Sequence, residues 1–155
     1  MKDATRVIAV TAESETDELG GKLARALEPG LVVALVGDLG AGKTRLVRAV
    51  ATALGADDNE VNSPTFVLVQ SYTARLPVFH FDTYRLRDAD EFSELGPEEY
   101  FEAGGVSFIE WADRVADSLP DDHLRIEMAA TGPTTRLIRF EATGPKSQQV
   151  LDRFV

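Results

Sequence analysis

The sequence predicts an α/β fold, in which a β-sheet carries helices on both faces and is mixed at its edges. Three observations lead to this prediction. Apolar runs of strand length alternate with helix-patterned segments along most of the chain. Two pairs of strand-like segments are each joined by a short turn, which is typical of antiparallel hairpins. The 155 residues contain no repeat, low-complexity tract or linker, so we expect one domain spanning residues 1–155.

The first half of the chain alternates strands and helices. Ser14 or Thr16 is expected to cap the first helix, because a hydroxyl accepts from a free N–H group of the first turn. The unbroken apolar run at 31–36 is typical of a strand buried in a parallel sheet. The expected elements are strands at 6–10 and 31–36, a helix with the stripe Leu19, Leu23, Ala26 and Leu27 that stops at Pro29-Gly30, and a helix with the stripe Leu46, Val47, Val50, Ala51 and Leu54 that stops at Gly55.

The second half continues this alternation after a polar connection at 57–60. Gly96-Pro97 is expected to break an acidic, mostly helical segment, and Pro120 to close a short helix. The two hairpins are expected at 66–82 and 123–140. The remaining expected elements are strands at 66–72, 78–82, 106–111, 123–128 and 135–140, and helices at 88–101, 112–119 and 147–154.

Residues 37–44 carry the clearest chemical signal. They read Gly-Asp-Leu-Gly-Ala-Gly-Lys-Thr, which matches the pattern G-x-x-x-x-G-K-[ST] of a phosphate-binding loop between a strand and a helix. Glycine permits the backbone conformations that turn successive N–H groups toward an anion. The helix that follows adds the positive end of its dipole. The predicted nucleotide-binding residues are Gly37, Asp38, Leu39, Gly40, Ala41, Gly42, Lys43, which can reach the outer phosphates, and Thr44, which can place its hydroxyl on Mg²⁺.

Two acids are candidates to complete this site. Asp82 and Glu110 each end a mostly apolar strand-like run. Ligands of open α/β sheets bind at the carboxyl ends of the strands, and Mg²⁺–triphosphate chemistry needs a carboxylate near the metal. The alternative is that each acid starts a loop or caps a helix, a role that suits Asp88 and Asp113 better. We therefore predict Asp82 and Glu110 as functional acids.

Four further features have both a functional and a structural interpretation. The segment 62–66, Asn-Ser-Pro-Thr-Phe, is either a switch loop that meets Mg²⁺ or the γ-phosphate, or an ordinary Ser-Pro turn. His80 in its strand is interpreted as a satisfied core histidine rather than a catalyst. Arg85 either neutralises phosphate or forms a structural ion pair. Trp111, the only tryptophan, either packs in the core or shapes a nucleotide pocket.

Composition limits the class of protein. The chain has no cysteine, which excludes disulfides and zinc–thiolate sites and fits a cytoplasmic location. No apolar stretch approaches the roughly 20 residues of a membrane helix, so no membrane role is expected. The formal net charge of −10 disfavours direct binding to nucleic acid, because phosphate contacts need clustered Lys and Arg. A basic protein partner is a better match.

Four segments together resemble a known family. They are Gly37 to Thr44, Ser63-Pro64-Thr65-Phe66, His80-Phe81-Asp82-Thr83-Tyr84-Arg85 and Ile109-Glu110-Trp111. In this order and spacing the chain, from about residue 11 to 132, resembles TsaE, the small ATPase of tRNA threonylcarbamoyladenosine (t6A) synthesis. The phosphate loop alone is shared by many ATPases, whereas the four segments together are specific. Residues 129–136 match loosely, and the chain after Thr135 carries no family motif.

This resemblance implies a fold and an activity. The fold would be a three-layer P-loop NTPase domain, a mixed sheet with a parallel core and antiparallel edge strands. The substrate would be ATP, with Mg²⁺ as cofactor. The protein would hydrolyse ATP slowly by itself and faster in a complex with the partner proteins TsaB and TsaD. Contact with tRNA would be made only through that complex. Thr44, Glu110 and Asp82 would form the metal site, with Asp82 and Glu110 as the catalytic acids. Thr65 would be the switch residue and Trp111 part of the nucleotide site.

Two other functions remain open from the residues. A small-molecule kinase would need an acceptor pocket and usually an arginine-rich lid, for which the segment 129–134 is short. A non-catalytic module would use ATP only to order the 63–66 loop for a partner, which the presence of both acids disfavours. A GTPase would normally show an Asn-Lys-x-Asp run, and the sequence has none.

Overall fold

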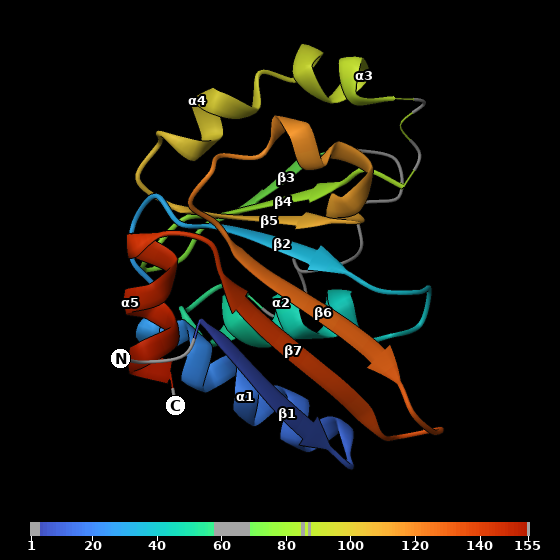
Figure 1. Ribbon diagram of the computed structural model, residues 1–155. Helices are drawn as coiled ribbons and strands as arrows, with labels where there is room; N and C mark the ends of the chain where they lie inside the picture. Colours follow the sequence, from blue (N-terminus) through green and yellow to red (C-terminus); the bar gives the residue numbers. More distant parts are fainter. Residues whose placement is uncertain (1–3, 58–68, 85, 87, 155) are drawn as a thin grey trace.

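The computed structural model describes residues 4–57, 69–84, 86 and 88–154. In this part of the chain, seven strands form one sheet in the order β1-β7-β6-β2-β5-β4-β3 (Figure 1). The strands are β1 (Thr5–Val10), β2 (Val32–Val36), β3 (Val69–Tyr72), β4 (Val78–Asp82), β5 (Val106–Glu110), β6 (Leu124–Ala130) and β7 (Arg136–Ala142).

The sheet is parallel in the middle and antiparallel at both edges, as predicted. Strands β6, β2, β5 and β4 pair in parallel. The hairpins β3–β4 and β6–β7 and the pairing of β1 with β7 are antiparallel. In the parallel core, both faces of a strand are covered, which explains the unbroken apolar sequence of β2.

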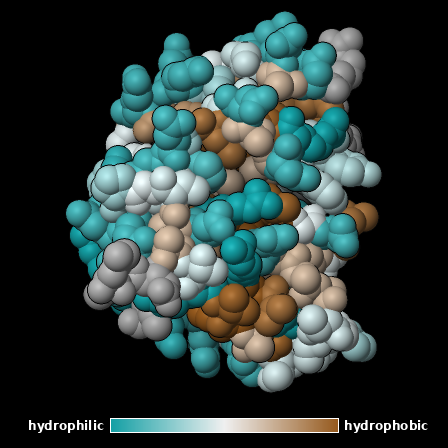
Figure 2. Space-filling model, in the orientation of Figure 1, coloured by the Kyte–Doolittle hydropathy of each residue, from teal (hydrophilic) through white to brown (hydrophobic). Residues whose placement is uncertain are grey.

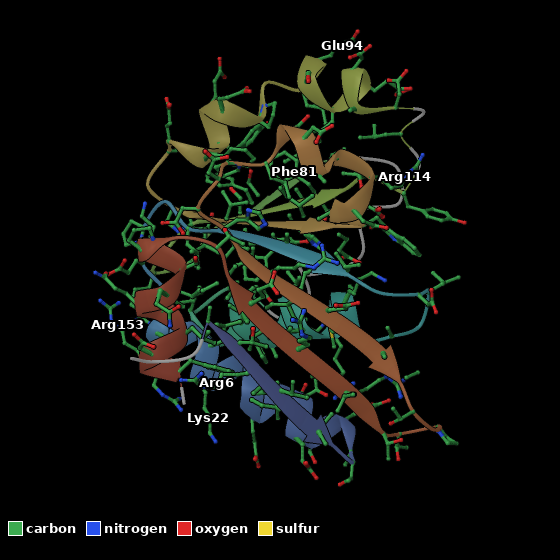
Figure 3. The ribbon with its side chains drawn as sticks, in the orientation of Figure 1. Arg6, Lys22, Phe81, Glu94, Arg114 and Arg153 are labelled. Atoms are coloured by element: carbon green, nitrogen blue, oxygen red, sulfur yellow. The ribbon has the colours of Figure 1, made fainter. Side chains whose placement is uncertain are left out.

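Helices cover both faces and complete three layers (Figure 1). One face packs against α1 (Glu13–Ala26), α2 (Lys43–Ala53) and α5 (Pro145–Phe154), with Leu23, Val47 and Leu151 fully buried. The other face packs, over β2, β5 and β4, against α3 (Ala89–Glu94), α4 (Pro97–Phe101) and the 3₁₀ segment η1 (Ala112–Ser118). Phe81 of β4 fills this second core and lies in edge contact with Phe92 and Tyr100 (Figure 3).

Within the described residues most of the predicted elements are confirmed, with two differences, and residues 66–68 of the predicted strand 66–72 lie outside them. The first helix begins at Glu13 with Ala12 as its N-cap residue and no side-chain cap, so the prediction of Ser14 or Thr16 as the cap was wrong. Glu15 instead accepts hydrogen bonds from the backbone N–H and hydroxyl of Thr11. The predicted helix at 112–119 is a 3₁₀ segment with a kink at Val115.

The acidic segment begins and breaks where the sequence predicted. Asp88 caps α3 by accepting from the backbone N–H of Glu91, and Gly96 and Pro97 separate α3 from α4. Asp113, the other expected cap, lies inside η1, whose N-cap residue is Trp111. None of the helices in the described part of the chain is long and apolar enough to cross a membrane.

Candidate active site

The loop between β2 and α2 has the backbone that the glycine pattern predicts. Gly37 has φ 153°, and a Cβ at this position would lie 2.4 Å from the carbonyl oxygen of Met128 on β6. Gly42 has φ 103° and serves as the N-cap residue of α2, without a side-chain cap. The N-cap residue therefore gives the first-turn N–H groups of α2 no side-chain acceptor, which is the arrangement that favours an anion.

Lys43 begins α2 and turns back over the loop. Its Nζ donates to the carbonyl oxygens of Gly37, at 2.6 Å, and Asp38, at 3.0 Å. The same Nζ lies 4.1 Å from the centre of the Trp111 ring, a cation–π contact. Burial lowers the pKa of Lys43, and attraction to nearby acids, Glu110 first among them, opposes this effect.

Thr44 and Glu110 are in direct contact. The Thr44 hydroxyl lies 3.1 Å and 2.9 Å from the two carboxylate oxygens of Glu110, at the end of β5. Glu110 is buried, and its Oε2 also lies 2.5 Å from Nε2 of His80. His80 is therefore the satisfied core histidine that the sequence predicted, but its partner is a site acid, which the sequence did not reveal.

Asp82 lies at the end of the neighbouring strand. It is paired in register with Glu110, so the two acids occupy adjacent positions at the carboxyl edge of β4 and β5. Its Oδ1 accepts from the backbone N–H of Tyr84 at 2.9 Å. Asp82 thus has both of the roles considered above, because it starts the loop after β4 and also faces the site.

A cavity of about 500 Å³ joins these residues. Its volume is in the range of small-molecule sites. The loop, the first turn of α2 and both acids contribute to its lining. The lining residues include Leu39, Gly40, Ala41, Gly42, Lys43, Thr44, Asp82, Glu110 and Trp111, together with Glu13, Thr16, Arg45, Tyr84, Thr134 and Arg136.

Trp111 has an unusual backbone. It is the only non-glycine residue with positive φ in the described part of the chain, with φ 61° and ψ 39°. For a bulky side chain this conformation costs about 1–3 kcal/mol, and such strain is concentrated at functional sites. The ring packs against Tyr84, with centroids 4.9 Å apart. The conformation places the indole ring over Lys43 and in the cavity wall.

Two residues that sequence reasoning did not assign to the site support it from behind. Thr83 donates its hydroxyl to the carbonyl oxygens of Glu110 and Trp111, which fastens the end of β4 to the end of β5. Arg114 of η1, labelled in Figure 3, donates to the carbonyl oxygens of Thr83, Tyr84 and Leu86. These bonds tie Thr83, Tyr84 and Leu86, after Asp82, to the end of β5 and to η1.

Arg136 supports the phosphate loop from the β6–β7 hairpin. Its guanidinium donates to the carbonyl oxygens of Gly40 and Ala41 at 3.2 Å and 3.0 Å, and to those of Gly132 and Thr135. The only sequence signal for this residue was its position in the loosely matching segment 129–136. Two predicted features, the switch residue Thr65 with its segment 62–66 and Arg85, lie outside the described residues.

The arrangement fits a triphosphate with a divalent cation. A glycine loop, a lysine and a helix N-terminus meet the anion, while a hydroxyl and carboxylates lie beside it. Mg²⁺ in nucleotide sites takes one or two protein carboxylates, phosphate oxygens and water. Thr44 and Glu110, with Asp82 adjacent, are the residues here that would match such a donor set. A lone carboxylate cluster would not explain the glycine loop.

Comparison with known proteins agrees with this site. The family model described as "Threonylcarbamoyl adenosine biosynthesis protein TsaE" matches residues 10–138. The TsaE protein of Bacillus subtilis is 38% identical over 139 residues, covering 89% of this chain and 86% of that protein. The TsaE protein of Treponema pallidum is 40% identical over 124 residues, covering 80% of this chain and 91% of that protein.

A solved structure shows the same architecture. The crystal structure of YdiB from Bacillus subtilis superposes with a TM-score of 0.82 at 30% sequence identity, covering 97% of this chain and 93% of that chain. The seven-stranded mixed sheet with its glycine loop is thus a P-loop NTPase fold. The family model and these relatives together show that the chain belongs to the TsaE family of threonylcarbamoyladenosine biosynthesis proteins.

Proposed function

We propose that this chain is a Mg²⁺-dependent ATPase that supports t6A formation on tRNA in a complex with TsaB and TsaD. One observation carries the proposal. The hydroxyl of Thr44, at the end of the phosphate loop, donates a hydrogen bond to the Glu110 carboxylate. Asp82, which is paired in register with Glu110, lines the same cavity. Membership of the TsaE family supports the assignment to t6A formation, and this group of side chains supports the assignment of ATP hydrolysis.

Each side chain has a defined task in this proposal. Lys43 exchanges its two carbonyl acceptors for phosphate oxygens, and the loop N–H groups hold the rest of the triphosphate. Thr44 and Glu110 hold Mg²⁺, which supplies charge neutralisation at the transferred phosphate. Asp82 and Glu110 are the two acids that complete the site. Trp111 closes the cavity beside Lys43 and limits the access of water.

A small-molecule kinase is the less favoured function. Only residues 131–135 connect β6 to β7, and Arg136 at the end of this turn binds the carbonyl oxygens of Gly40 and Ala41. The Arg136 guanidinium thus donates to carbonyl oxygens of the loop, whereas a kinase lid folds over the phosphates with its arginines toward them.

The experiment measures ATP hydrolysis by the chain alone and with TsaB and TsaD. We expect slow turnover alone and faster turnover in the complex. Asp82→Asn and Glu110→Gln should each lose most of this turnover while still binding ATP, because both keep the side-chain shape and remove the charge. Glu141→Gln, which changes an acid of β7 paired with Arg139, is the matched control and should keep the full rate.

The result separates the three functions. Normal hydrolysis by either site variant would make that acid structural. ATP binding without hydrolysis in the full complex would favour the non-catalytic binding module. Phosphoryl transfer to an added small molecule, in place of hydrolysis, would favour the kinase.

A further inference from the structure

A row of polar side chains, buried at Glu110, His80 and Tyr72 and half-buried at Gln70, extends from the Glu110 carboxylate toward the edge of the sheet. His80 of β4 has no exposed surface, and its Nε2 lies 2.5 Å from Glu110 Oε2. Its Nδ1 lies 3.0 Å from the hydroxyl of Tyr72, which in turn is 2.7 Å from Oε1 of Gln70. Hydrogen bonds therefore link β3, through β4, to the acid at the end of β5.

The pleat and register of the sheet create this row. His80 and Asp82 are two residues apart in β4, so their side chains share one face. Gln70 pairs with His80 across the β3–β4 hairpin, and Asp82 pairs with Glu110. His80 does not line the cavity, so its contact with the site is through Glu110.

Glu110 needs such a contact to keep its orientation. A carboxylate only accepts hydrogen bonds, and its long side chain has several rotamers. Thr44 holds it on one side, but the ammonium of Lys43 also attracts it. The bond from His80 to Oε2 opposes rotation toward Lys43, and Tyr72 fixes the imidazole that provides this bond.

We propose that His80, held by Tyr72, is a positioning residue that orients the Glu110 carboxylate for the divalent cation bound with ATP. This inference rests on the proposed function. It gives a role to a histidine that does not touch the nucleotide, and it makes the affinity for the cation depend on a hydrogen bond made beneath the cavity.

The test is calorimetry of ATP binding in EDTA and across a series of Mg²⁺ concentrations. His80→Leu removes the donor in a side chain of similar volume. We expect the ATP affinity of this variant in EDTA to equal that of the wild type. Mg²⁺ should raise the ATP affinity of both proteins, but the Mg²⁺ concentration that gives half of this increase should be about tenfold higher, or more, in the variant. His80→Gln, whose amide N–H can replace Nε2–H, should recover most of the loss. Tyr72→Phe should give a smaller shift in the same direction.

Two controls separate positioning from general damage. Phe81→Leu alters the neighbouring residue of β4 on the opposite face of the sheet and should lower the melting temperature without changing the Mg²⁺ dependence (Figure 3). In a Glu110→Gln background, His80→Leu should add no further loss, because both changes act on the same carboxylate.

The outcomes also distinguish this inference from the proposed function. If wild-type ATP binding does not respond to Mg²⁺, the proposed function fails. If the wild type responds and His80→Leu responds equally, only the inference is overturned. Should His80→Leu fail to fold, the pair His80→Gln and Tyr72→Phe decides, and a wild-type Mg²⁺ dependence in Tyr72→Phe overturns the inference.

Discussion

Lys43 is buried, a position that a lysine occupies only where other groups compensate for the hydration that its ammonium group loses. A buried ammonium group loses hydration, and burial accordingly lowers its pKa. Two backbone carbonyls and the face of the Trp111 ring replace part of that hydration. The ammonium is thus kept within the loop, close to where phosphate oxygens would bind, and the same contacts would be exchanged when a triphosphate enters.

Replacing this lysine tests the nucleotide site directly. We expect Lys43→Ala to keep the fold and to weaken Mg·ATP binding at least tenfold, because a charge-assisted phosphate contact contributes about 1.5–3 kcal/mol. Calorimetry measures the change. Lys22→Ala, at an exposed lysine of α1, is the control and should bind ATP normally (Figure 3). Equal affinities in the two variants would contradict the assignment of the loop.

The residues that lie together at the cavity could be predicted from the sequence where a local rule applied. The loop pattern located Lys43 and Thr44, and the strand-end rule located Asp82 and Glu110. The contacts of His80 and Arg136 could not be predicted in this way. The first depends on the register of β4 against β5, and the second on the closure of the β6–β7 hairpin beside the loop.

Secondary structure was predictable for a similar reason, since periodicity and glycine or proline stops act within a few residues. The order of the strands was not. The pairing of β1 with β7 joins segments from opposite ends of the chain, and the local sequence of β1 does not indicate which strand it will pair with. The start of α1 was also mispredicted from local sequence. The carboxylate of Glu15 accepts from the backbone N–H and hydroxyl of Thr11, and the helix begins at Glu13, before Ser14 could act as its cap.

The contact between α1 and α2 depends on a glycine. A Cβ at Gly20 would lie 2.5 Å from the Cβ of Ala49 and 3.2 Å from the carbonyl carbon of Ala49, so the two helices would have to separate. The neighbouring Gly21 has room, because its nearest contact would be Arg25 Nη1 at 3.8 Å. The two glycines are adjacent in one helix and therefore form a matched pair.

Alanine substitutions at these glycines should have opposite effects. At Gly20, overpacking costs about 1–3 kcal/mol, which exceeds the gain in helix propensity of about 1 kcal/mol because backbone atoms of α2 obstruct the methyl group. At Gly21 only the gain remains, so stability should rise by about 0.5–1 kcal/mol. Urea unfolding measures both. Stabilisation by Gly20→Ala would show that α1 and α2 are not tightly packed at this point.

The last helix is capped from outside its own sequence. Asp122 accepts from the backbone N–H groups of Lys146 and Ser147 and from the Ser147 hydroxyl, at 2.7–3.0 Å. Burial raises the pKa of Asp122, but the hydrogen bonds from Ser147 and Lys146 outweigh this effect and leave the pKa below its ordinary value. The ionised carboxylate therefore stabilises the folded chain.

This cap predicts a dependence on pH. Because the folded-state pKa lies below the unfolded value of about 3.9, the stabilisation is fully present above that value and is lost as the pH falls through the folded one. Asp122→Ala should cost about 0.5–2 kcal/mol at pH 7. In urea unfolding, the difference in free energy of unfolding between this variant and the wild type should become smaller as the pH falls below about 4. A difference that stays constant in acid would mean that the charge contributes nothing.

At the scale of the whole molecule, the surface is acidic and partly apolar. The net charge is −10, and α3 and α4 carry Asp90, Glu91, Glu94, Glu98 and Glu99. In the orientation of Figure 1, the face of β6, β7 and β1 has no helix in front of it, and Figure 2 shows apolar surface there. Val7 and Leu137 of β1 and β7 are 57% and 44% exposed. Such a surface suits protein partners better than RNA.

The charge and the family together give the final prediction, that the chain supports t6A formation only through its protein complex. Depletion of the protein, followed by nucleoside analysis of bulk tRNA, should show a loss of t6A. Binding of the isolated chain to tRNA should be negligible at physiological salt, because an anionic surface cannot release the counterions of RNA. Binding to a basic partner should weaken as salt rises, because the attraction is screened. Undiminished t6A, in cells without a second copy, would refute the role. Tight tRNA binding by the chain alone would refute the indirect mechanism even if t6A were lost, since the complex would then not be needed to bring the two together.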